Sequence, residues 1–320
     1  MRKLTPSHTP GNLRQMNDTH GAARTIAVVL NWCAEEDTAA CVESLLADRT
    51  PELDVLIVDN DSVDGSGARL ASRFSSLGYL QTGANLGYAG GNQRAIEWAM
   101  ARGYDFVLIC NDDAELRPGC VQAMLVAIRD NPRVAACAPT IVHPGDDAVI
   151  WWAGGRWQPY KAMGTHESYG RRLSEVLAAH DAPEPATFLS GCVLLLRVKA
   201  LRACGGFREE FFAYVEDLEL SVRLHRAGWT LLWVPHAVAL HKVPYPAPEA
   251  SPFAIRLRDV NRRRLVALRY GWLQALAFAA WFYPTRVAHL LRYTLRGDRG
   301  HARAIIAGMF DSIRVPSANL

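Results

Sequence analysis

The chain has 320 residues, of which 50% are hydrophobic and 21% charged, and this globular composition excludes a largely disordered protein. The net charge of +3 hides an asymmetry: residues 252–320 hold twelve Arg, no Lys and three Asp, a charge of +9, so the preceding 251 residues carry −6. A basic tail on an acidic body suggests an anionic partner for the tail, either a membrane surface or a nucleic acid.

The first residues contain no apolar stretch of the kind a signal peptide needs. Residues 1–23 are polar, and we expect them to form a disordered N-terminal extension. The seven cysteines are scattered along the chain, and no pair has CxxC spacing. Both features favour a reducing cytoplasm in which the thiols stay reduced.

Apolar, β-branched runs alternate with segments of helical spacing over the first part of the chain. This alternation, about every 20 to 30 residues, indicates a mainly parallel, doubly wound α/β sheet. Ligands of such sheets bind beyond the carboxyl ends of the strands. We predict strands at 25–31, 53–58, 78–81, 106–110 and 134–138, and helices at 36–47, 65–77, 90–102 and 118–130.

The pattern breaks over residues 141–185, which are rich in Gly, Pro and aromatic residues and predict irregular structure with one hairpin. The tail is Arg-rich and helical. Its most apolar part, 270–285, contains Gln274 and Pro284 and is too short to span a membrane, so it is either a buried helix or an interfacial one. Between these segments we predict a strand at 188–197, a helix at 216–227, a strand at 229–234 and a short apolar segment at 237–240.

Polar side chains follow the first two predicted strands. Asn31 ends the first strand, and Asp59-Asn60-Asp61-Ser62 follows the second. An acidic loop at a strand end can accept hydrogen bonds from the base or ribose of a nucleotide. The alternative is a loop that caps the next helix, because Asp and Ser are preferred N-caps.

A glycine-rich segment, Asn85–Asn92, precedes the helix predicted at 90–102. Glycines at a helix N-terminus let backbone N–H groups approach an anion such as a phosphate. The spacing matches neither a Walker loop nor GxGxxG, so an ordinary connecting loop is the alternative.

Three polar residues, Asn111-Asp112-Asp113, directly follow the apolar strand predicted at 106–110. Adjacent carboxylates repel each other unless a cation is shared between them. Hard oxygen ligands suit Mg²⁺ or Mn²⁺, with phosphate groups completing the coordination shell. A solvated pair of capping residues is the alternative.

Two further positions could carry chemistry. Glu216 and Asp217 open a helix after an aromatic run, where a carboxylate is a candidate general base. Acidic residues also favour a helix N-terminus through the helix dipole, which is the structural alternative. His241 follows a short apolar segment, and a lone His is most often structural.

Together these segments resemble the family 2 glycosyltransferases with the GT-A fold, and within them the bacterial rhamnosyltransferase-like members. The resemblance covers about residues 25–241 and continues weakly into the tail. Each motif is weak alone, but their order and spacing make chance matching improbable. The motifs are VVLNW at 28–32, IVDNDSVDGS at 57–66, NLGYAGGNQRAI at 85–96, CNDDAEL at 110–116, SGCVLLLR at 190–197, GGFREEFFAYVEDLELSVRLHRAGW at 205–229, and the histidine at 241.

The resemblance implies a role for each matching residue. It implies that Asp217 is the catalytic base, in a pair with Glu216, and that Asp113 and His241 ligate Mg²⁺ or Mn²⁺. The chain departs from the DxD-type motif because Asn111 stands first, so Asp113 is expected to be the main carboxylate ligand. The remaining matches are expected to bind the nucleotide sugar: Asn31, Asp59, Asp61, Asn85, Gly87, Asn92, Asn111 and Asp112.

The resemblance also implies a GT-A domain over 24–250, a Rossmann-like, mainly parallel sheet flanked by helices, followed by a basic C-terminal helical region over 251–320. The implied reaction is an inverting single displacement, in which a sugar moves from a nucleotide to an acceptor hydroxyl without a covalent enzyme intermediate. The rhamnosyltransferase-like members suggest dTDP-rhamnose as donor and a glycan or polyprenyl-linked acceptor in cell-envelope synthesis. A UDP-hexose or UDP-galactofuranose donor is the alternative.

Two other functions are alternatives to glycosyl transfer. A nucleotidyltransferase is expected to show a Gly- and Lys-rich donor loop near the N-terminus, yet the chain has only four Lys and no such loop. A catalytically silent nucleotide-sugar-binding protein would not need Asp113, Asp217 and His241 together, so the presence of all three argues against this alternative.

The tail also has alternative partners. Its basic cluster, followed by an aromatic run over 272–283, is typical of a helix at an anionic membrane surface. Helices that pack on the catalytic domain are the structural alternative. We expect peripheral association with the inner face of the cell membrane rather than nucleic-acid binding. The cluster consists of Arg256, Arg258, Arg262, Arg263 and Arg264.

Overall fold

The computed structural model describes residues 23–51, 53–145 and 148–312. The extension predicted over 1–23 lies outside the described residues apart from its last residue, as does the end of the tail from 313 onward.

The N-terminal half of the sheet is parallel. Strand β1 (Thr25–Asn31) lies between β2 (Leu53–Asp59) and β4 (Phe106–Asn111), and β3 (Gly78–Gln81) adds to the outer side of β2. All seven residues of β1 are buried, as its continuous apolar run predicts for a central parallel strand. Asn31 pairs with Asp59 and Leu30 pairs with Asn111, so the polar residues that end these strands meet at one edge of the sheet.

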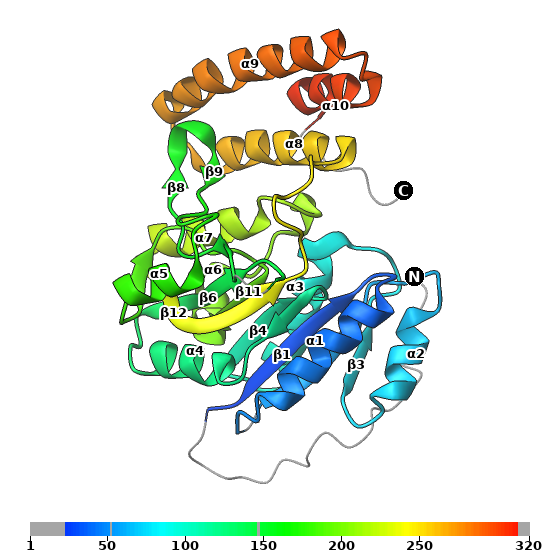
Figure 1. Cartoon of the computed structure of the whole chain (residues 1–320), viewed down its shortest axis with the longest axis vertical. Coiled ribbons are helices and arrows are strands. Elements are labelled where there is room, and N and C mark those ends of the chain that lie inside the picture. The colour runs from blue at the N-terminus through cyan, green and yellow to red at the C-terminus, as the bar shows by residue number, and fades with distance from the viewer. Residues whose placement is uncertain (1–22, 52, 146–147, 313–320) are drawn as a thin grey trace.

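Helices flank this half of the sheet close to where the sequence predicts them (Figure 1). The one informative difference is that α3 begins at Gly87 rather than at 90, so most of the glycine-rich segment belongs to its first turns. Gly87 has φ of 68°, and a Cβ there would lie 2.5 Å from the carbonyl oxygen of Phe212, so only glycine permits this close approach. The helices are α1 (Glu35–Ala47), α2 (Ser66–Arg73), α3 (Gly87–Ala101) and α4 (Cys120–Arg129).

The second half of the sheet is mixed. Strand β11 (Val193–Arg197) runs antiparallel between β4 and β6 (Val134–Val142), and β12 (Thr230–His241) runs parallel to β6. The strand predicted at 188–197 begins only at Val193, because residues 188–192 form a loop that lines a cavity. The segments predicted at 229–234 and 237–240 are one strand, β12, whose register shifts between Val234 and Val238.

The segment between β6 and β11 contains the one predicted hairpin, β8 (Trp157–Gln158) with β9 (Met163–Gly164). It also contains a helix that the sequence did not predict, α5 (Leu173–Ala179), which is too short to show a helical period. The remaining short elements are β5 (Ala114–Leu116), β7 (Ile150–Trp152), η1 (Pro159–Lys161), β10 (Glu184–Ala186), α6 (Val198–Cys204) and η2 (Glu209–Phe211).

The tail forms three helices stacked at one end of the molecule: α8 (Pro252–Arg269), α9 (Trp272–Leu295) and α10 (Arg299–Phe310) (Figure 1). The β8–β9 hairpin reaches up to them, and α8 lies nearest the sheet (Figure 1). Among the residues that the structure describes, none of the helices has the length and apolar character needed to cross a bilayer. The predicted fold class, a mainly parallel sheet flanked by helices with a C-terminal helical extension, is confirmed.

Candidate active site

At the end of β1, the side chain of Asn31 is completely buried and bonded within the protein. Its Nδ2 donates to Asp59 Oδ1 at 2.9 Å, to Ser62 Oγ at 2.9 Å and to Ser66 Oγ at 3.0 Å, and its Oδ1 accepts from Thr38 Oγ1 at 3.0 Å. Asn31 therefore orients the Asp59 carboxylate and the loop after β2. The contact with a nucleotide that the sequence predicts for this region stays a prediction.

The loop after β2 and the glycine-rich segment are joined by Asn60, a residue of the predicted acidic loop to which the sequence assigns no role of its own. Its Nδ2 donates to Asn85 Oδ1 at 3.1 Å and to the Gly87 carbonyl at 3.2 Å, and its Oδ1 accepts from the Leu86 N–H at 3.0 Å. The predicted nucleotide-binding residues Asn85 and Gly87 are thus held beside the end of β2. Next to Asn60, Asp61 has φ of 63° and remains partly exposed.

On α3, Asn92 and Tyr88 differ in what they face. Asn92 is completely buried and its Nδ2 donates to the Tyr88 carbonyl at 3.0 Å, so it braces the first turns of the helix. Tyr88 lines the cavity described below, and its hydroxyl donates to the Gly191 carbonyl at 2.7 Å. Tyr88 lies inside the NLGYAGGN motif, but its aromatic ring gave no signal of this role in the sequence.

The predicted metal site is assembled by strand pairing. The chain turns at Asp112 and Asp113 between β4 and β5, and Ala114 of β5 pairs with His241 at the end of β12. This register places His241 Nε2 at 3.2 Å from Asp113 Oδ2 although the two residues are far apart in the sequence. The ring of Trp151 meets the imidazole edge to face, with 4.5 Å between the ring centroids.

Three polar atoms at this site are buried without a hydrogen-bond partner: Asn111 Oδ1, Asp113 Oδ1 and His241 Nδ1. Buried polar atoms are normally paired, and the two oxygens are of the type that a divalent cation prefers, whereas Nδ1 is the ring nitrogen turned away from Asp113. In the described residues no group of three or more His, Cys, Asp or Glu side chains is arranged to hold a metal ion by itself, so phosphate and water oxygens would have to complete the coordination.

The electrostatics of the site follow from its burial. Burial and the charge of Asp113 raise the pKa of Asp112 to about 7. Burial alone would raise the pKa of Asp113, but the hydrogen bond and charge of His241 hold it below its usual range. Burial would lower the pKa of His241, but Cys192 and Asp113 raise it to about 10. The site therefore stabilises positive charge beside Asp113.

The predicted base, Asp217, lies in the first turn of α7 (Glu216–Arg226). Its Oδ2 accepts from the Gly191 N–H at 3.0 Å, and its Oδ1 accepts from the Leu218 N–H at 2.7 Å, so the carboxylate has one orientation. Burial raises the pKa of Asp217, and these hydrogen bonds oppose the increase only in part. Burial and the charge of Asp217 raise the pKa of the neighbouring Glu216 well above its usual value.

The loop that enters α7 has an unusual backbone. Phe212, Tyr214 and Val215 have φ of 59°, 67° and 73°, a region that non-glycine residues rarely adopt, and least of all the β-branched Val. Each such residue costs on the order of 1–3 kcal/mol and persists only where the surroundings enforce it. One restraint is a hydrogen bond of 2.8 Å from the Ala89 N–H on α3 to the Phe212 carbonyl.

The second restraint comes from α8. The completely buried Asn261 directs its Nδ2 at three carbonyls of this loop, those of Phe211 at 2.7 Å, Ala213 at 2.9 Å and Tyr214 at 2.8 Å. A further link joins the buried Glu219 of α7 to Arg269 of α8, whose Nε lies 2.8 Å from Glu219 Oε1. The C-terminal region therefore holds the element that carries Asp217.

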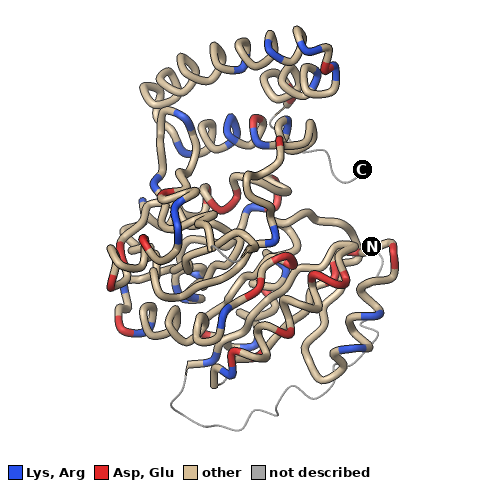
Figure 2. Tube along the Cα trace, in the orientation of Figure 1, with Lys and Arg blue, Asp and Glu red and all other residues tan. Residues whose placement is uncertain are grey.

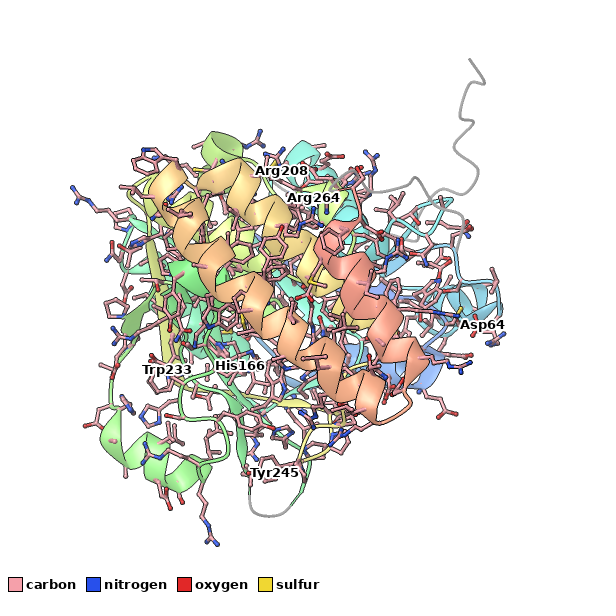
Figure 3. The ribbon with its side chains drawn as sticks, turned by 90° about the horizontal axis from the view of Figure 1, so that it is seen from above. Asp64, His166, Arg208, Trp233, Tyr245 and Arg264 are labelled. Carbon is pink, nitrogen blue, oxygen red and sulfur yellow. The ribbon has the colours of Figure 1, made fainter. Side chains whose placement is uncertain are left out.

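A cavity of about 1040 Å³ unites the two predicted centres. Asn111 and His241 line one part, Asp217 and Glu216 line another, and Arg258 of α8 lines a third. The other predicted site residues lie outside its lining: Asn31, Asp59, Asp61, Asn85, Gly87, Asn92, Asp112 and Asp113. Figure 3 shows how α9 and α10 cover this end of the molecule, with His166, which lines the cavity, on one side of them and Asp64, in the loop after β2, on the other.

The sequence model of the family described as "Glycosyl transferase family 2" matches residues 26–205. The N-acetylglucosaminyl-diphospho-decaprenol L-rhamnosyltransferase of Mycobacterium tuberculosis is 34% identical over 261 residues, covering 76% of this chain and 80% of the relative. A galactofuranosyltransferase of the same organism is 26% identical over 207 residues, covering 63% of this chain and 64% of the relative.

Two solved structures share the fold. A mannosyltransferase from Pyrobaculum calidifontis in complex with GDP-Man and Mn²⁺ superimposes with a TM-score of 0.56 at 15% identity, covering 91% of this chain and 87% of that one. GalNAc-T7 with UDP, GalNAc and Mn²⁺ gives 0.56 at 13% identity, covering 81% of this chain and 54% of that one. These matches confirm the GT-A fold, and the family match confirms the resemblance stated above. The chain belongs to glycosyl transferase family 2.

Proposed function

We propose that the protein transfers a deoxyhexose, rhamnose from dTDP-rhamnose, to a hydroxyl of a polyprenyl-diphosphate-linked glycan with inversion at the anomeric carbon, as a step of cell-envelope polysaccharide synthesis. The 34% identity to the rhamnosyltransferase supports the choice of sugar and acceptor. The observation that carries the proposed chemistry is the single cavity into which Asp217, Asn111 and His241 all project.

In this reaction Asp217 acts as the general base. It takes the proton of the acceptor hydroxyl, whose oxygen forms a bond with the anomeric carbon while the bond from that carbon to the donor phosphate breaks. The raised pKa of Asp217 makes it a stronger base than an exposed carboxylate, and the two backbone N–H groups keep it aimed at the acceptor. Burial and the charge of Asp217 raise the pKa of Glu216 well above its usual value, so Glu216 is a weaker acid than an exposed carboxyl group.

Asn111 and Asp113 would hold the divalent cation, Mg²⁺ or Mn²⁺, through their oxygen atoms that lack partners, and His241 would join them through Nε2, which faces Asp113. When bound, it supplies positive charge that stabilises the nucleoside diphosphate as the leaving group. The loops after β1 and β2, braced by Asn31 and Asn60, are proposed to hold the nucleotide beside this site.

A panel of nucleotide sugars tests the donor. We expect dTDP-rhamnose with Mg²⁺ or Mn²⁺ to raise the unfolding temperature most, and to yield a rhamnosylated product with a GlcNAc-diphosphoryl lipid. The 26% identity to a galactofuranosyltransferase favours UDP-galactofuranose as the second candidate. Turnover with UDP-galactofuranose and none with dTDP-rhamnose would contradict the proposed donor, but the protein would still be a glycosyltransferase.

We also propose that α9 and α10 bind the inner face of the cell membrane. One face of α9 buries Phe278 and Phe282, while the opposite face exposes a stripe of apolar side chains. Figure 2 shows a long part of α9 without charge, whereas Lys and Arg gather toward its end and on α8. An apolar face next to cations is what an anionic lipid surface binds. The exposed apolar residues are Trp272, Leu273, Leu276, Tyr283, Val287, Leu291, Leu295, Ile306 and Phe310, and the exposed cations are Arg292, Arg296, Arg299 and Arg303.

Flotation with anionic liposomes tests this association. The double substitution Leu276→Asp with Leu291→Asp should remove most of the liposome-bound fraction, because it places two charges in the apolar face. Val126→Asp is the matched control, since Val126 is also about half exposed but lies on α4. Equal binding of both variants and of the unchanged protein would exclude this face as the membrane contact.

A further inference from the structure

The wall of the cavity formed by α8 and α9 carries three guanidinium groups, two of which share one carboxylate. Arg262 Nη1 lies 3.3 Å and Arg286 Nη1 lies 3.1 Å from Oδ1 of Asp259, which is buried. Two positive charges thus face one negative charge, and Nε of Arg286 is buried without a hydrogen-bond partner. This wall has more donors and more positive charge than its carboxylate can satisfy.

Arg258, the third guanidinium group, differs from the rest of the basic cluster. Its guanidinium lies 4.7 Å from the centroid of the Tyr214 ring, and it forms no hydrogen bond or ion pair with any residue that the structure describes. By contrast, Arg256 pairs with Asp311, and Arg263 donates to carbonyls at the end of α10. Arg258 is exposed to the cavity, so its donors face the space in which a substrate must lie.

The position of Arg258 separates it from the donor phosphates. Tyr214 precedes Asp217 by three residues, so Arg258 lies on the base side of the cavity. The atoms suited to a cation lie instead at Asn111, Asp113 and His241, where β4 and β12 end. Glu249, the carboxylate in the segment before α8 that lines the cavity, is occupied by a 2.7 Å hydrogen bond from the Tyr293 hydroxyl.

We propose that Arg258 binds the diphosphate of the lipid-linked acceptor. This inference rests on the function proposed above. An acceptor of this class presents a hydroxyl to the base and carries its anion at the other side of the same sugar, and guanidinium groups recognise phosphate by paired hydrogen bonds. The helical layer that holds Arg258 also exposes the apolar face proposed to bind the membrane, so lipid and diphosphate would meet neighbouring parts of one structure.

Steady-state kinetics with two acceptors test the proposal: a short-chain GlcNAc-diphosphoryl lipid and an uncharged alkyl GlcNAc glycoside of equal chain length. Arg258→Gln should lower kcat/KM for the diphosphate acceptor about tenfold to a hundredfold, the size expected for hydrogen bonds to a charged group. The uncharged acceptor should change far less, and Arg258→Lys should recover part of the loss. Arg256→Gln, on the same helix but outside the cavity lining, should leave both acceptors unchanged.

Three results would overturn the subsite. The first is an equal loss of kcat/KM with both acceptors in Arg258→Gln. The second is a lower affinity of Arg258→Gln for the nucleoside diphosphate, measured with Mn²⁺. The third is that the unchanged protein uses both acceptors with the same kcat/KM. Each of these leaves glycosyl transfer itself intact. No transfer from any nucleotide sugar to either acceptor by the unchanged protein would instead contradict the proposed function, and the subsite with it.

Discussion

The two sides of the candidate site, the loops after β1 and β2 and the cavity wall beside α8, are built in different ways. On the proposed nucleotide side, the polar residues that end β1 and β2 bond to one another and to the glycine-rich segment of the same half of the sheet, as Asn31 does with Asp59 and Asn60 with Asn85. On the acceptor side, residues of α8 reach across to the loop before α7, as Asn261 does with the Tyr214 carbonyl. The first arrangement lies within the parallel half of the sheet, and the second joins the loop before α7 to the C-terminal helices.

This difference determines how substitutions on each side of the site affect donor binding and turnover. The nucleotide side is braced from within its own loops, whereas the orientation of Asp217 depends on α8, which belongs to a region that the sequence separates from the catalytic domain. We therefore expect substitutions in α8 to impair turnover while leaving donor binding intact, and substitutions at the metal site to weaken metal-dependent donor binding.

The largest effect is expected at the base itself. Asp217→Asn keeps the shape of the side chain but cannot accept a proton, so kcat should fall by about 10²–10⁴-fold while the affinity for the nucleoside diphosphate stays the same. Product formation and nucleotide titration on the same preparation measure both quantities. Substantial residual turnover would refute the assignment of the base.

At the opposite end, Asp113→Ala removes the carboxylate that faces His241. The gain in donor affinity on adding Mg²⁺ or Mn²⁺ should be largely lost, because a hard oxygen ligand is missing. Calorimetric titration of the donor with and without metal measures this gain. The metal site is wrong if the gain is the same in the variant and in the unchanged protein.

A smaller effect is expected at Asn261→Ala, which frees three carbonyls of the strained loop. We expect kcat to fall about tenfold to a hundredfold through misplacement of Asp217, with the donor KM little changed. Loss of buried hydrogen bonds should also lower the unfolding free energy by about 1–3 kcal/mol. An unchanged kcat in a destabilised variant would show that α8 stabilises the fold without positioning the base.

The smallest effect concerns pH. Because the pKa of Asp217 is raised, the base is ionised only above that value, so kcat/KM should fall with decreasing pH at a value above the ordinary Asp pKa of about 3.9. The positive charge of Arg258 favours the carboxylate form, while Glu216 opposes it when ionised. Arg258→Gln should therefore move the acidic limb to higher pH. A shift to lower pH would contradict this electrostatic arrangement.

Local patterns made the nucleotide side predictable. The apolar runs of β1, β2 and β4 and the polar residues that follow them identify the sheet, the strand ends and the candidate ligands, because each depends on neighbours in the sequence. Asp113 and His241 were named as partners through the family resemblance, and the pairing of Ala114 with His241 explains why they meet.

The acceptor side could not be predicted in the same way. The arginines of α8 form one basic cluster in the sequence, yet in the structure Arg262 pairs with Asp259, Arg256 pairs with Asp311, and only the fold shows that Arg258 faces the cavity. Nothing in the sequence marks Asn261 as important for the site, because its hydrogen-bond partners lie about 50 residues away. They belong to a loop whose backbone conformation cannot be predicted from its residue types.

The anomeric configuration of the product tests the central claim most directly. With Asp217 as a base and no enzyme nucleophile at the sugar, nuclear magnetic resonance of the product should show a configuration opposite to that of the nucleotide sugar. A product that retains the donor configuration would exclude a single in-line displacement and would contradict this account.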